Sequence, residues 1–209
     1  MSRHPAAELA RLRKVLFHAS SYGAWPTIAE LGLRTTGELL AASGLARPAA
    51  ARTKNIDVIL ESGHNVTIRD QRPMVRAKIE AHLDGISVRE WLDILNERVF
   101  LFVRQKELTA MLGRYQEAEG QDVVVFDTSK LLAATATRME VSTVNSSEPV
   151  PWTRCPCRSR STFLPIGSYS GSVGDIEEAT VIGGIDDVST LVVRVIRYHP
   201  DHTTEVLVA

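Results

Sequence analysis

A chain of 209 residues with 44% hydrophobic and 23% charged side chains has the composition of a globular protein that can bury a substantial core. Its formal net charge of −1 excludes a strongly basic protein, so any nucleic acid would have to be held by a local basic patch. No stretch approaches the roughly 20 apolar residues of a membrane helix and the N-terminus has no long apolar run, so we expect a cytoplasmic protein.

Short helices are expected near the N-terminus. Residues 5–14 have the apolar spacing of an amphipathic helix, and residues 14–19 then form an apolar run that predicts a buried strand. Pro26 and Gly32 bracket a second helix, because proline is tolerated at a helix start and glycine at its end. Thr36 at the start and Gly44 after the end predict a third helix over residues 36–43.

The middle of the chain mixes irregular and regular segments. Residues 46–65 are polar and predict a mobile excursion, which in a compact domain is often functional. Ser87 and Glu90 form a capping box that opens a helix over 88–96. The next expected elements are a strand over 98–103, a helix over 105–112 and strands over 122–127 and 138–144.

Strands dominate the end of the chain. The proline-, glycine- and serine-rich segment 145–175 predicts a long surface loop. Strands are expected over 178–182 and 190–198, with Gly183-Gly184 as a hairpin turn between them and a weaker edge strand over 203–208.

Helices gather early and strands late, which favours an α+β fold over a doubly wound α/β sheet. We expect a single domain over residues 1–209, with its N-terminal helix within residues 1–13. The usual dinucleotide, phosphate-loop, nucleophile-elbow and zinc-protease motifs do not occur in the sequence. Cys155 and Cys157 are predicted to be reduced thiols in a loop, because no further Cys or His cluster stands near them to complete a metal site.

The segment Phe17-His18-Ala19-Ser20, followed by Trp25-Pro-Thr-Ile28 and Gly32-Leu33, resembles the opening motif of one ADP-ribosyltransferase branch, which includes DarT-type DNA ADP-ribosyltransferase toxins. Over residues 15–197 the chain also resembles an uncharacterised bacterial domain family, distantly similar to these toxins. The downstream motifs that follow in order are Thr67-Ile-Arg69-Asp-Gln-Arg72-Pro-Met74, Asn96-Glu-Arg98-Val-Phe100-Leu-Phe102, Asn145-Ser146, Ser161-Thr162-Phe163 and Ile176-Glu177-Glu178-Ala-Thr-Val181. The resemblance implies an ADP-ribosyltransferase-like split β-sheet core.

A carboxylate is the central group of the implied chemistry. Breaking the nicotinamide–ribose bond passes through an oxocarbenium-like transition state, as in glycoside cleavage. A carboxylate that hydrogen-bonds the 2′-hydroxyl favours the developing positive charge. The resemblance assigns this role to Glu178, and strand alternation turns Glu177 to the opposite face. The alternative is that both are solvent-facing charges at a strand edge.

The resemblance also implies groups that hold NAD. The His18 imidazole would hold a ribose hydroxyl, the Ala19 backbone would contact the nicotinamide amide, and Ser20 would add a hydrogen bond. Tyr22 and Phe100 could stack on the nicotinamide ring, although Phe100 is equally suited to a core position. The alternative for His18 is a histidine merely satisfied at the end of a strand.

Arginines provide the expected contacts to phosphate. Arg69, slightly preferred over Arg72, is implied to meet the NAD pyrophosphate or to assist the acceptor, because guanidinium binds phosphate oxygens two at a time. The alternative is a surface pair with Asp70. A further cluster could contact a DNA or RNA backbone or could be solvated charge; it comprises Arg154, Arg158 and Arg160.

The resemblance thus implies a mono-ADP-ribosyltransferase that uses NAD, without a metal, to modify a nucleic-acid base or another acceptor. Such an enzyme fits a toxin or defence effector, which would have an antitoxin or hydrolase partner. Two alternatives stay open: an NAD glycohydrolase, in which water replaces the acceptor, and a non-catalytic nucleotide- or partner-binding module of the same fold. The second is motivated by the middle motif, where Ser161-Thr162-Phe163 replaces the family's aromatic-Glu or Ser-Thr-Ser pattern.

Overall fold

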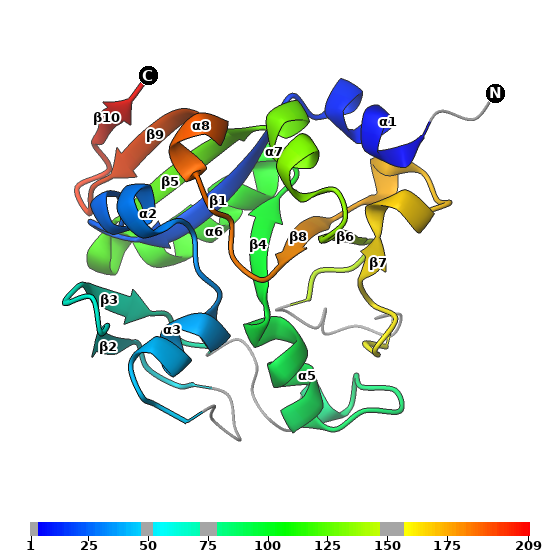
Figure 1. The fold of residues 1–209 in the computed structure, drawn as a ribbon, viewed down its shortest axis with the longest axis horizontal. Coiled ribbons are helices and arrows are strands. Elements are labelled where there is room, and N and C mark those ends of the chain that lie inside the picture. The colour runs from blue at the N-terminus through cyan, green and yellow to red at the C-terminus, as the bar shows by residue number, and fades with distance from the viewer. Residues whose placement is uncertain (1–3, 47–51, 72–78, 147–156) are drawn as a thin grey trace.

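The computed structural model describes residues 4–46, 52–71, 79–146 and 157–209 (Figure 1). Eight strands of the described residues form one sheet in the order β10-β9-β5-β1-β4-β8-β6-β7, and every neighbouring pair is antiparallel. The architecture is mixed α+β, as the order of elements predicts. The strands are β1 Val15–Ser21, β4 Arg98–Phe102, β5 Gln121–Asp127, β6 Met139–Ser142, β7 Leu164–Pro165, β8 Glu178–Ile182, β9 Val192–Tyr198 and β10 Thr204–Val208.

The sheet is divided in its middle. β1 pairs with β5 along its whole length, but its register with β4 consists of the single pair Phe17↔Phe102. On either side of this point lie the half-sheets β10-β9-β5-β1 and β4-β8-β6-β7. Beyond Phe17 the two halves separate, which leaves the last residues of β1 without β4 as a partner.

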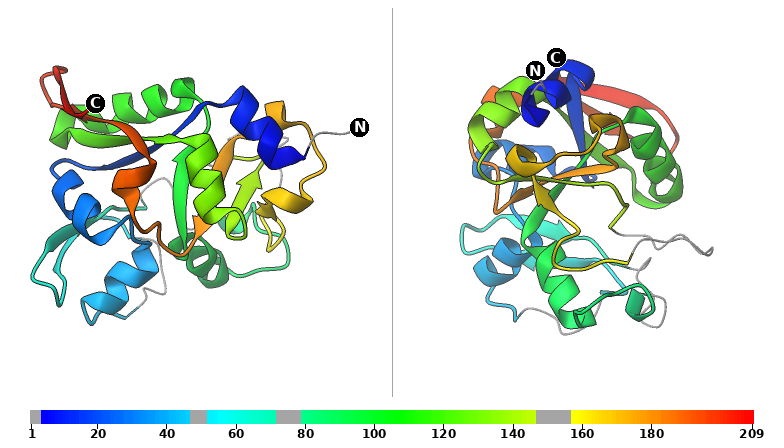
Figure 2. Two further views of the ribbon diagram at one scale, coloured as in Figure 1. Left: turned by 45° about the horizontal axis from the view of Figure 1, so that its top comes forward. Right: turned by 90° about the vertical axis from the view of Figure 1, so that its right-hand side faces the viewer.

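Helices cover both faces of the sheet (Figure 2). Alternation along β1 sends Leu16 into the main core and Phe17 into a second cluster with α6, because successive strand residues point to opposite faces. The helices are α1 Pro5–Leu12, α2 Trp25–Leu31, α3 Thr36–Ala42, α5 Val88–Asn96, α6 Gln105–Glu119, α7 Thr128–Thr135 and α8 Val188–Leu191.

A smaller layer lies beside the divided sheet. β2 (Ile56–Ile59) and β3 (Asn65–Ile68) form a two-stranded ribbon that packs on α3. The ribbon, α3 and α5 gather below β1 and β4 in Figure 1. The apolar cluster that joins the ribbon to α3 contains Leu40, Val58, Leu60 and Ile68.

Most of the expected elements are confirmed, and the capping box Ser87–Glu90 opens α5 as predicted. The third helix begins at Thr36, as predicted, and its N-cap is Thr35, which accepts from the Glu38 N–H. The sequence reasoning missed α7, which Asp127 caps through the Lys130 N–H.

Two segments that were expected to be surface loops are partly regular or partly buried. Residues 46–65 include β2 and the start of β3, so the expectation of an excursion is wrong for the described part. Alternating apolar side chains there, including Val58, are buried against α3. The surface loop expected over 145–175 also fails for its described part, where Phe163, Ile166 and Tyr169 are buried.

The expected hairpin turn at Gly183-Gly184 is wrong. β8 pairs with β4 and β6, whereas β9 pairs with β5 and β10, so no hairpin joins them. Gly184 instead permits a close approach to the segment after α2, where Leu33 and Ile185 exchange backbone hydrogen bonds of 2.9 and 2.8 Å. A Cβ on Gly184 would lie 2.9 Å from the Leu33 carbonyl oxygen.

Gly32→Ala tests this close approach. Gly32 has φ +81°, and a Cβ there would lie 2.6 Å from the Ile185 carbonyl oxygen. Because both the backbone conformation and the contact are unfavourable, we expect a loss of about 3 kcal/mol in the free energy of unfolding. The matched control is Gly44→Ala, which has φ +70° but no atom within 4 Å of the added Cβ. Equal losses in urea titrations of the two variants would show that the contact is unimportant.

Within the described ranges, no helix is both long and apolar enough to cross a membrane.

Candidate active site

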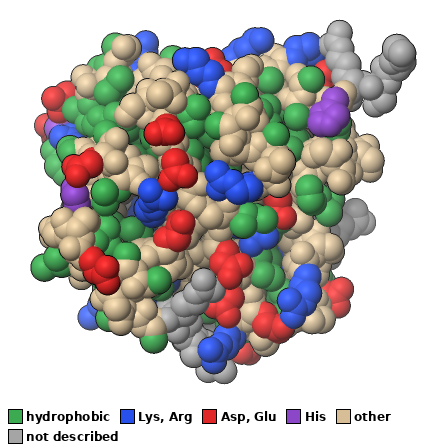
Figure 3. Space-filling view, in the orientation of Figure 1, with side chains coloured by type: hydrophobic (Ala, Val, Ile, Leu, Met, Phe, Trp, Pro, Cys, Tyr) green, Lys and Arg blue, Asp and Glu red, His purple; other side chains and the backbone are tan. Residues whose placement is uncertain are grey.

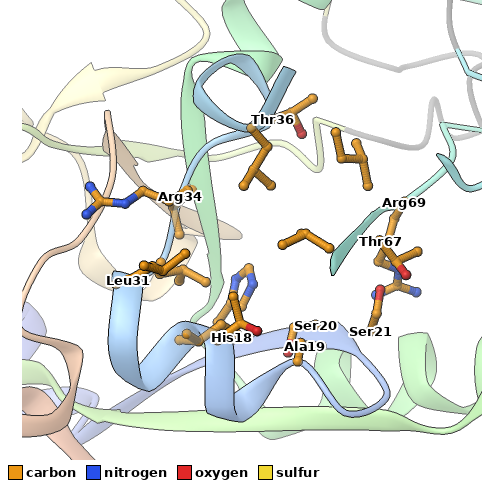
Figure 4. A pocket seen from close by; sticks show the side chains of 18 of the residues that line it. His18, Ala19, Ser20, Ser21, Leu31, Arg34, Thr36, Thr67 and Arg69 are labelled. Carbon is orange, nitrogen blue, oxygen red and sulfur yellow. The ribbon is translucent and has the colours of Figure 1, made fainter. Parts of the chain in front are cut away.

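A cleft with two adjoining compartments lies where β1 and β4 diverge. The first compartment, about 260 Å³, is bounded by β1, α2 and β3 (Figure 4). The second, about 380 Å³, is bounded by β4, α6, β8 and residues 145–146. The residues that line both compartments are Thr36, Arg69, Arg98 and Phe100.

His18 lines the first compartment from β1, and Figure 4 shows its ring turned into the cavity. Its Nδ1 lies 2.9 Å from the Phe100 carbonyl oxygen on β4. Burial lowers the pKa of the imidazole to about 4; the bond to Phe100 opposes this, and the Arg69 charge lowers the pKa further. Near pH 7 the ring is therefore neutral, Nδ1 carries the proton that the carbonyl accepts, and Nε2 is left as an acceptor.

Glu178 is the first residue of β8 and lines the second compartment. Its Oε2 accepts a hydrogen bond of 3.1 Å from the Ser146 backbone N–H. Burial raises the pKa of the carboxyl to about 7, the bonds to Ser146 and the Arg158 charge lower it, and Glu177 raises it. A carboxyl with its pKa this far above the ordinary value is typical of functional sites.

Glu177 is placed differently from its neighbour. Its carboxylate pairs with the Arg104 guanidinium at 2.9 Å, and Arg104 also bonds Glu107 and the Gly174 and Ile176 carbonyls. Glu177 does not line either compartment. The preference for Glu178 over Glu177 therefore agrees with the side of the strand that faces the cleft.

The other residues of the opening motif line the first compartment beside His18. Ala19 is half-buried on β1, and Ser20 is buried, with its hydroxyl donating to the Asp122 carbonyl at 3.0 Å. Tyr22 is exposed; its hydroxyl lies 3.1 Å from His199 Nδ1 and the Arg197 guanidinium covers its ring at 4.8 Å.

Arg69 follows β3 and lines both compartments. Its Nη1 donates to Gln121 Oε1 at 3.3 Å. Arg72, the other candidate in this motif, lies outside the described residues. Arg34, at the opposite wall, turns away from the cavity toward Asp186, with which it pairs at 2.8 Å (Figure 4). Arg69 is therefore the better placed of Arg34 and Arg69 to meet a phosphate in the cleft.

Phe100 lines both compartments and also packs against the core. Its ring lines the cleft and packs edge-on against buried Phe163 at a centroid distance of 6.0 Å. It is therefore a core residue that also presents an apolar surface to a ligand.

The expected arginine cluster is not one exposed loop. Arg158 is 1% exposed, so its expected place on a flexible surface loop is wrong. Arg160 is exposed and pairs with Glu90. Arg154 and Cys155 lie outside the described residues, and Cys157 is an exposed free thiol.

Charges of both signs are interspersed on the face of the molecule shown in Figure 3, where no single-sign patch dominates the described side chains. Contact with a nucleic-acid backbone through the arginine cluster remains a prediction. A search of the described ranges finds no group of three or more His, Cys, Asp or Glu side chains that could hold a metal ion.

Several cleft residues were given no role by the sequence reasoning. Arg98 pairs with the buried Glu140 at 2.8 Å and lies 4.9 Å from the centre of the Phe163 ring. Buried Arg52 donates to the Arg69 carbonyl at 3.1 Å, and its pKa is lowered by burial and raised by Asp70. Arg98 lies within a quoted motif, but no local pattern marks Arg52 because its partners are distant in the chain.

The fold and the cleft define an α+β protein with a small-molecule-sized site between two half-sheets. The family DUF7002, described as a family of unknown function, matches residues 14–208, and the chain belongs to that family. No curated protein matches the sequence at a significant level.

Proposed function

We propose that this protein is an ADP-ribosyltransferase that cleaves the nicotinamide–ribose bond of NAD and transfers ADP-ribose to an acceptor. The observation that carries the proposal is the placement of His18 and Glu178 in adjoining compartments of one cleft. These residues are 160 positions apart in the chain, and the resemblance to the ADP-ribosyltransferase branch selects both of them. The division of the sheet between β1 and β4 supports an ADP-ribosyltransferase-like core.

The first compartment suits the ribose end of a dinucleotide. The neutral His18 ring offers Nε2 to a ribose hydroxyl, because Nδ1 is engaged by the Phe100 carbonyl. Tyr22 and Phe100 provide aromatic surface for the pyridine ring, and Arg69 provides positive charge for phosphate.

Glu178 would act on the bond that breaks. Its ionised carboxylate accepts a hydrogen bond from the 2′-hydroxyl and stabilises the positive charge that develops on the ribose. The C1′–nitrogen bond breaks, nicotinamide leaves with the bonding electron pair, and the acceptor bonds to C1′ as it loses its proton. Burial strengthens this interaction because the effective dielectric constant of the site is low.

The experiment measures nicotinamide release and label transfer from NAD labelled in its adenosine half, with DNA, RNA and cell protein as acceptors. We expect nicotinamide release together with transfer to one acceptor class. Release without transfer would indicate an NAD glycohydrolase. Tight binding of NAD without release would indicate a binding module, and neither binding nor release would refute the proposal.

The rate should depend on pH through Glu178. Because burial raises the pKa of this carboxyl to about 7, only about half of the molecules carry the ionised form at pH 7. We expect kcat/KM to fall about tenfold per pH unit below pH 6 and to level off above pH 8. His18, with its pKa lowered to about 4, stays neutral over this range. A rate profile that is flat from pH 5 to 8 would contradict the role of Glu178.

A further inference from the structure

We infer that Arg158 is a positioning residue, whose buried guanidinium fixes the peptide group between Asn145 and Ser146, the N–H of which donates to the Glu178 carboxylate. The importance of this carboxylate for NAD cleavage rests on the proposed function, but its geometry does not. The sequence predicted Arg158 on a surface loop, either in contact with nucleic acid or as solvated charge, and its burial requires another explanation.

Arg158 is anchored in the interior by its backbone. Its N–H donates to the His82 carbonyl at 2.7 Å, and its carbonyl accepts from the Asp84 N–H at 2.9 Å. These two bonds flank a parallel bridge between Leu83 and Arg158. The side chain therefore starts from a fixed backbone position.

The guanidinium reaches the peptide group between Asn145 and Ser146. Arg158 Nη2 donates to the Asn145 carbonyl at 2.6 Å. The N–H of the same peptide group belongs to Ser146 and donates to Glu178 Oε2 at 3.1 Å. Because a peptide group is planar, fixing its carbonyl toward Arg158 also fixes its N–H toward Glu178.

The two hydrogen bonds are coupled through the peptide group that they share. A cation on the carbonyl side polarises the peptide and strengthens the hydrogen bond that its N–H donates. If the guanidinium is removed, the Asn145 carbonyl loses a buried donor and the peptide can rotate away from Glu178. A buried arginine is costly to desolvate, so a specific role of this kind explains its burial better than stability does.

The positive charge of Arg158 and the hydrogen bond from Ser146 both favour the ionised form of Glu178. Burial raises the pKa of Glu178, whereas its bonds to Ser146 and the Arg158 charge lower it. The neighbouring Glu177 raises it, and Glu140 lies on the adjacent strand β6. The other charged residues that line the same compartment are Arg52, Arg69, Asp70, Arg98 and Glu107.

The test compares Arg158→Gln with Arg158→Lys. The Glu178 pKa is measured by NMR of 13C-labelled carboxyl groups, with the signal assigned through Glu178→Gln, and the rate of NAD cleavage is measured from pH 5 to 9. In Arg158→Gln we expect the Glu178 pKa to rise by about 1 pH unit. The rate should then fall about fivefold at pH 7 and recover by pH 9, because the ionised fraction is restored there.

Arg158→Lys keeps the charge but lacks the planar fork, so we expect a rise in the Glu178 pKa of about half a pH unit. This variant decides the question if Arg158→Gln does not fold. The matched control is Arg11→Gln, which removes an exposed arginine that pairs with Glu8, lines neither compartment and should leave both measurements unchanged.

An unchanged Glu178 pKa in the Arg158 variants would overturn the inference, as would a loss of rate that is equal at every pH. The carboxyl titration does not require NAD cleavage. If the wild-type protein fails to cleave NAD, the proposed function falls while the titration still decides the role of Arg158.

Discussion

Glu178→Gln is expected to lower kcat for nicotinamide release by about 10³-fold while changing the affinity for NAD by less than about threefold. The amide keeps the size of the side chain but has no negative charge to stabilise the oxocarbenium-like transition state. The change is therefore confined to the chemical step. The measurement combines steady-state release of nicotinamide with calorimetric titration of NAD into the variant.

The loss should not come from unfolding. The buried carboxyl of Glu178 keeps its proton in the folded state up to about pH 7, whereas the unfolded chain releases it near pH 4.5. Wild-type stability therefore falls as pH rises through this window, by on the order of 3 kcal/mol, and glutamine avoids the loss. Above pH 7 the variant should unfold at higher urea concentration than the wild-type protein. Full activity of Glu178→Gln, or equal loss in Glu177→Gln, would contradict the assignment.

His18→Ala is expected to reduce kcat/KM for NAD cleavage by about 30-fold, mostly through weaker binding, because Nε2 no longer accepts a hydrogen bond from the ribose. The substitution also removes the bond to the Phe100 carbonyl, which ties β1 to β4. A second variant, His18→Asn, offers an amide N–H to that carbonyl and so separates the two roles. The measurement is kcat and KM for both variants.

The matched control is His64→Ala, since His64 lies outside both compartments and contacts Ser62 and Glu30 instead. His18→Asn should regain stability but not NAD affinity. If His18→Asn regained both, the imidazole would be important only for joining the two half-sheets.

The sequence predicts elements whose signals are local. The bounds of α5 follow from the capping box at Ser87 and Glu90, whose groups lie three residues apart. α7 was missed because its cap, Asp127, is also the last residue of β5, so the strand pattern hides the helix start. The β2–β3 ribbon was missed because its strands have only four residues each. Their buried apolar side chains pack on α3, which is distant in the chain.

The candidate site was only partly predictable, because its motifs are local but the groups that surround them are distant in the chain. His18 and Glu178 could be selected because each lies within a short motif, which the structure places inside β1 for His18 and at the start of β8 for Glu178. Their pKa values depend on burial and on groups far away in the chain that oppose its effect: the Phe100 carbonyl for His18, and Ser146 and Arg158 for Glu178. A polar, proline-rich segment gave no sign that Arg158 would be buried, because burial here follows from tertiary pairing with residues 82–84.

A crystal structure of Glu178→Gln soaked with NAD tests most directly whether the two compartments form one site. We predict that the nicotinamide ribose lies between them, with a hydroxyl within about 3 Å of His18 Nε2 and the 2′-hydroxyl against the side chain at position 178. NAD bound elsewhere on the molecule, or bound in the cleft without contact to either residue, would contradict the account.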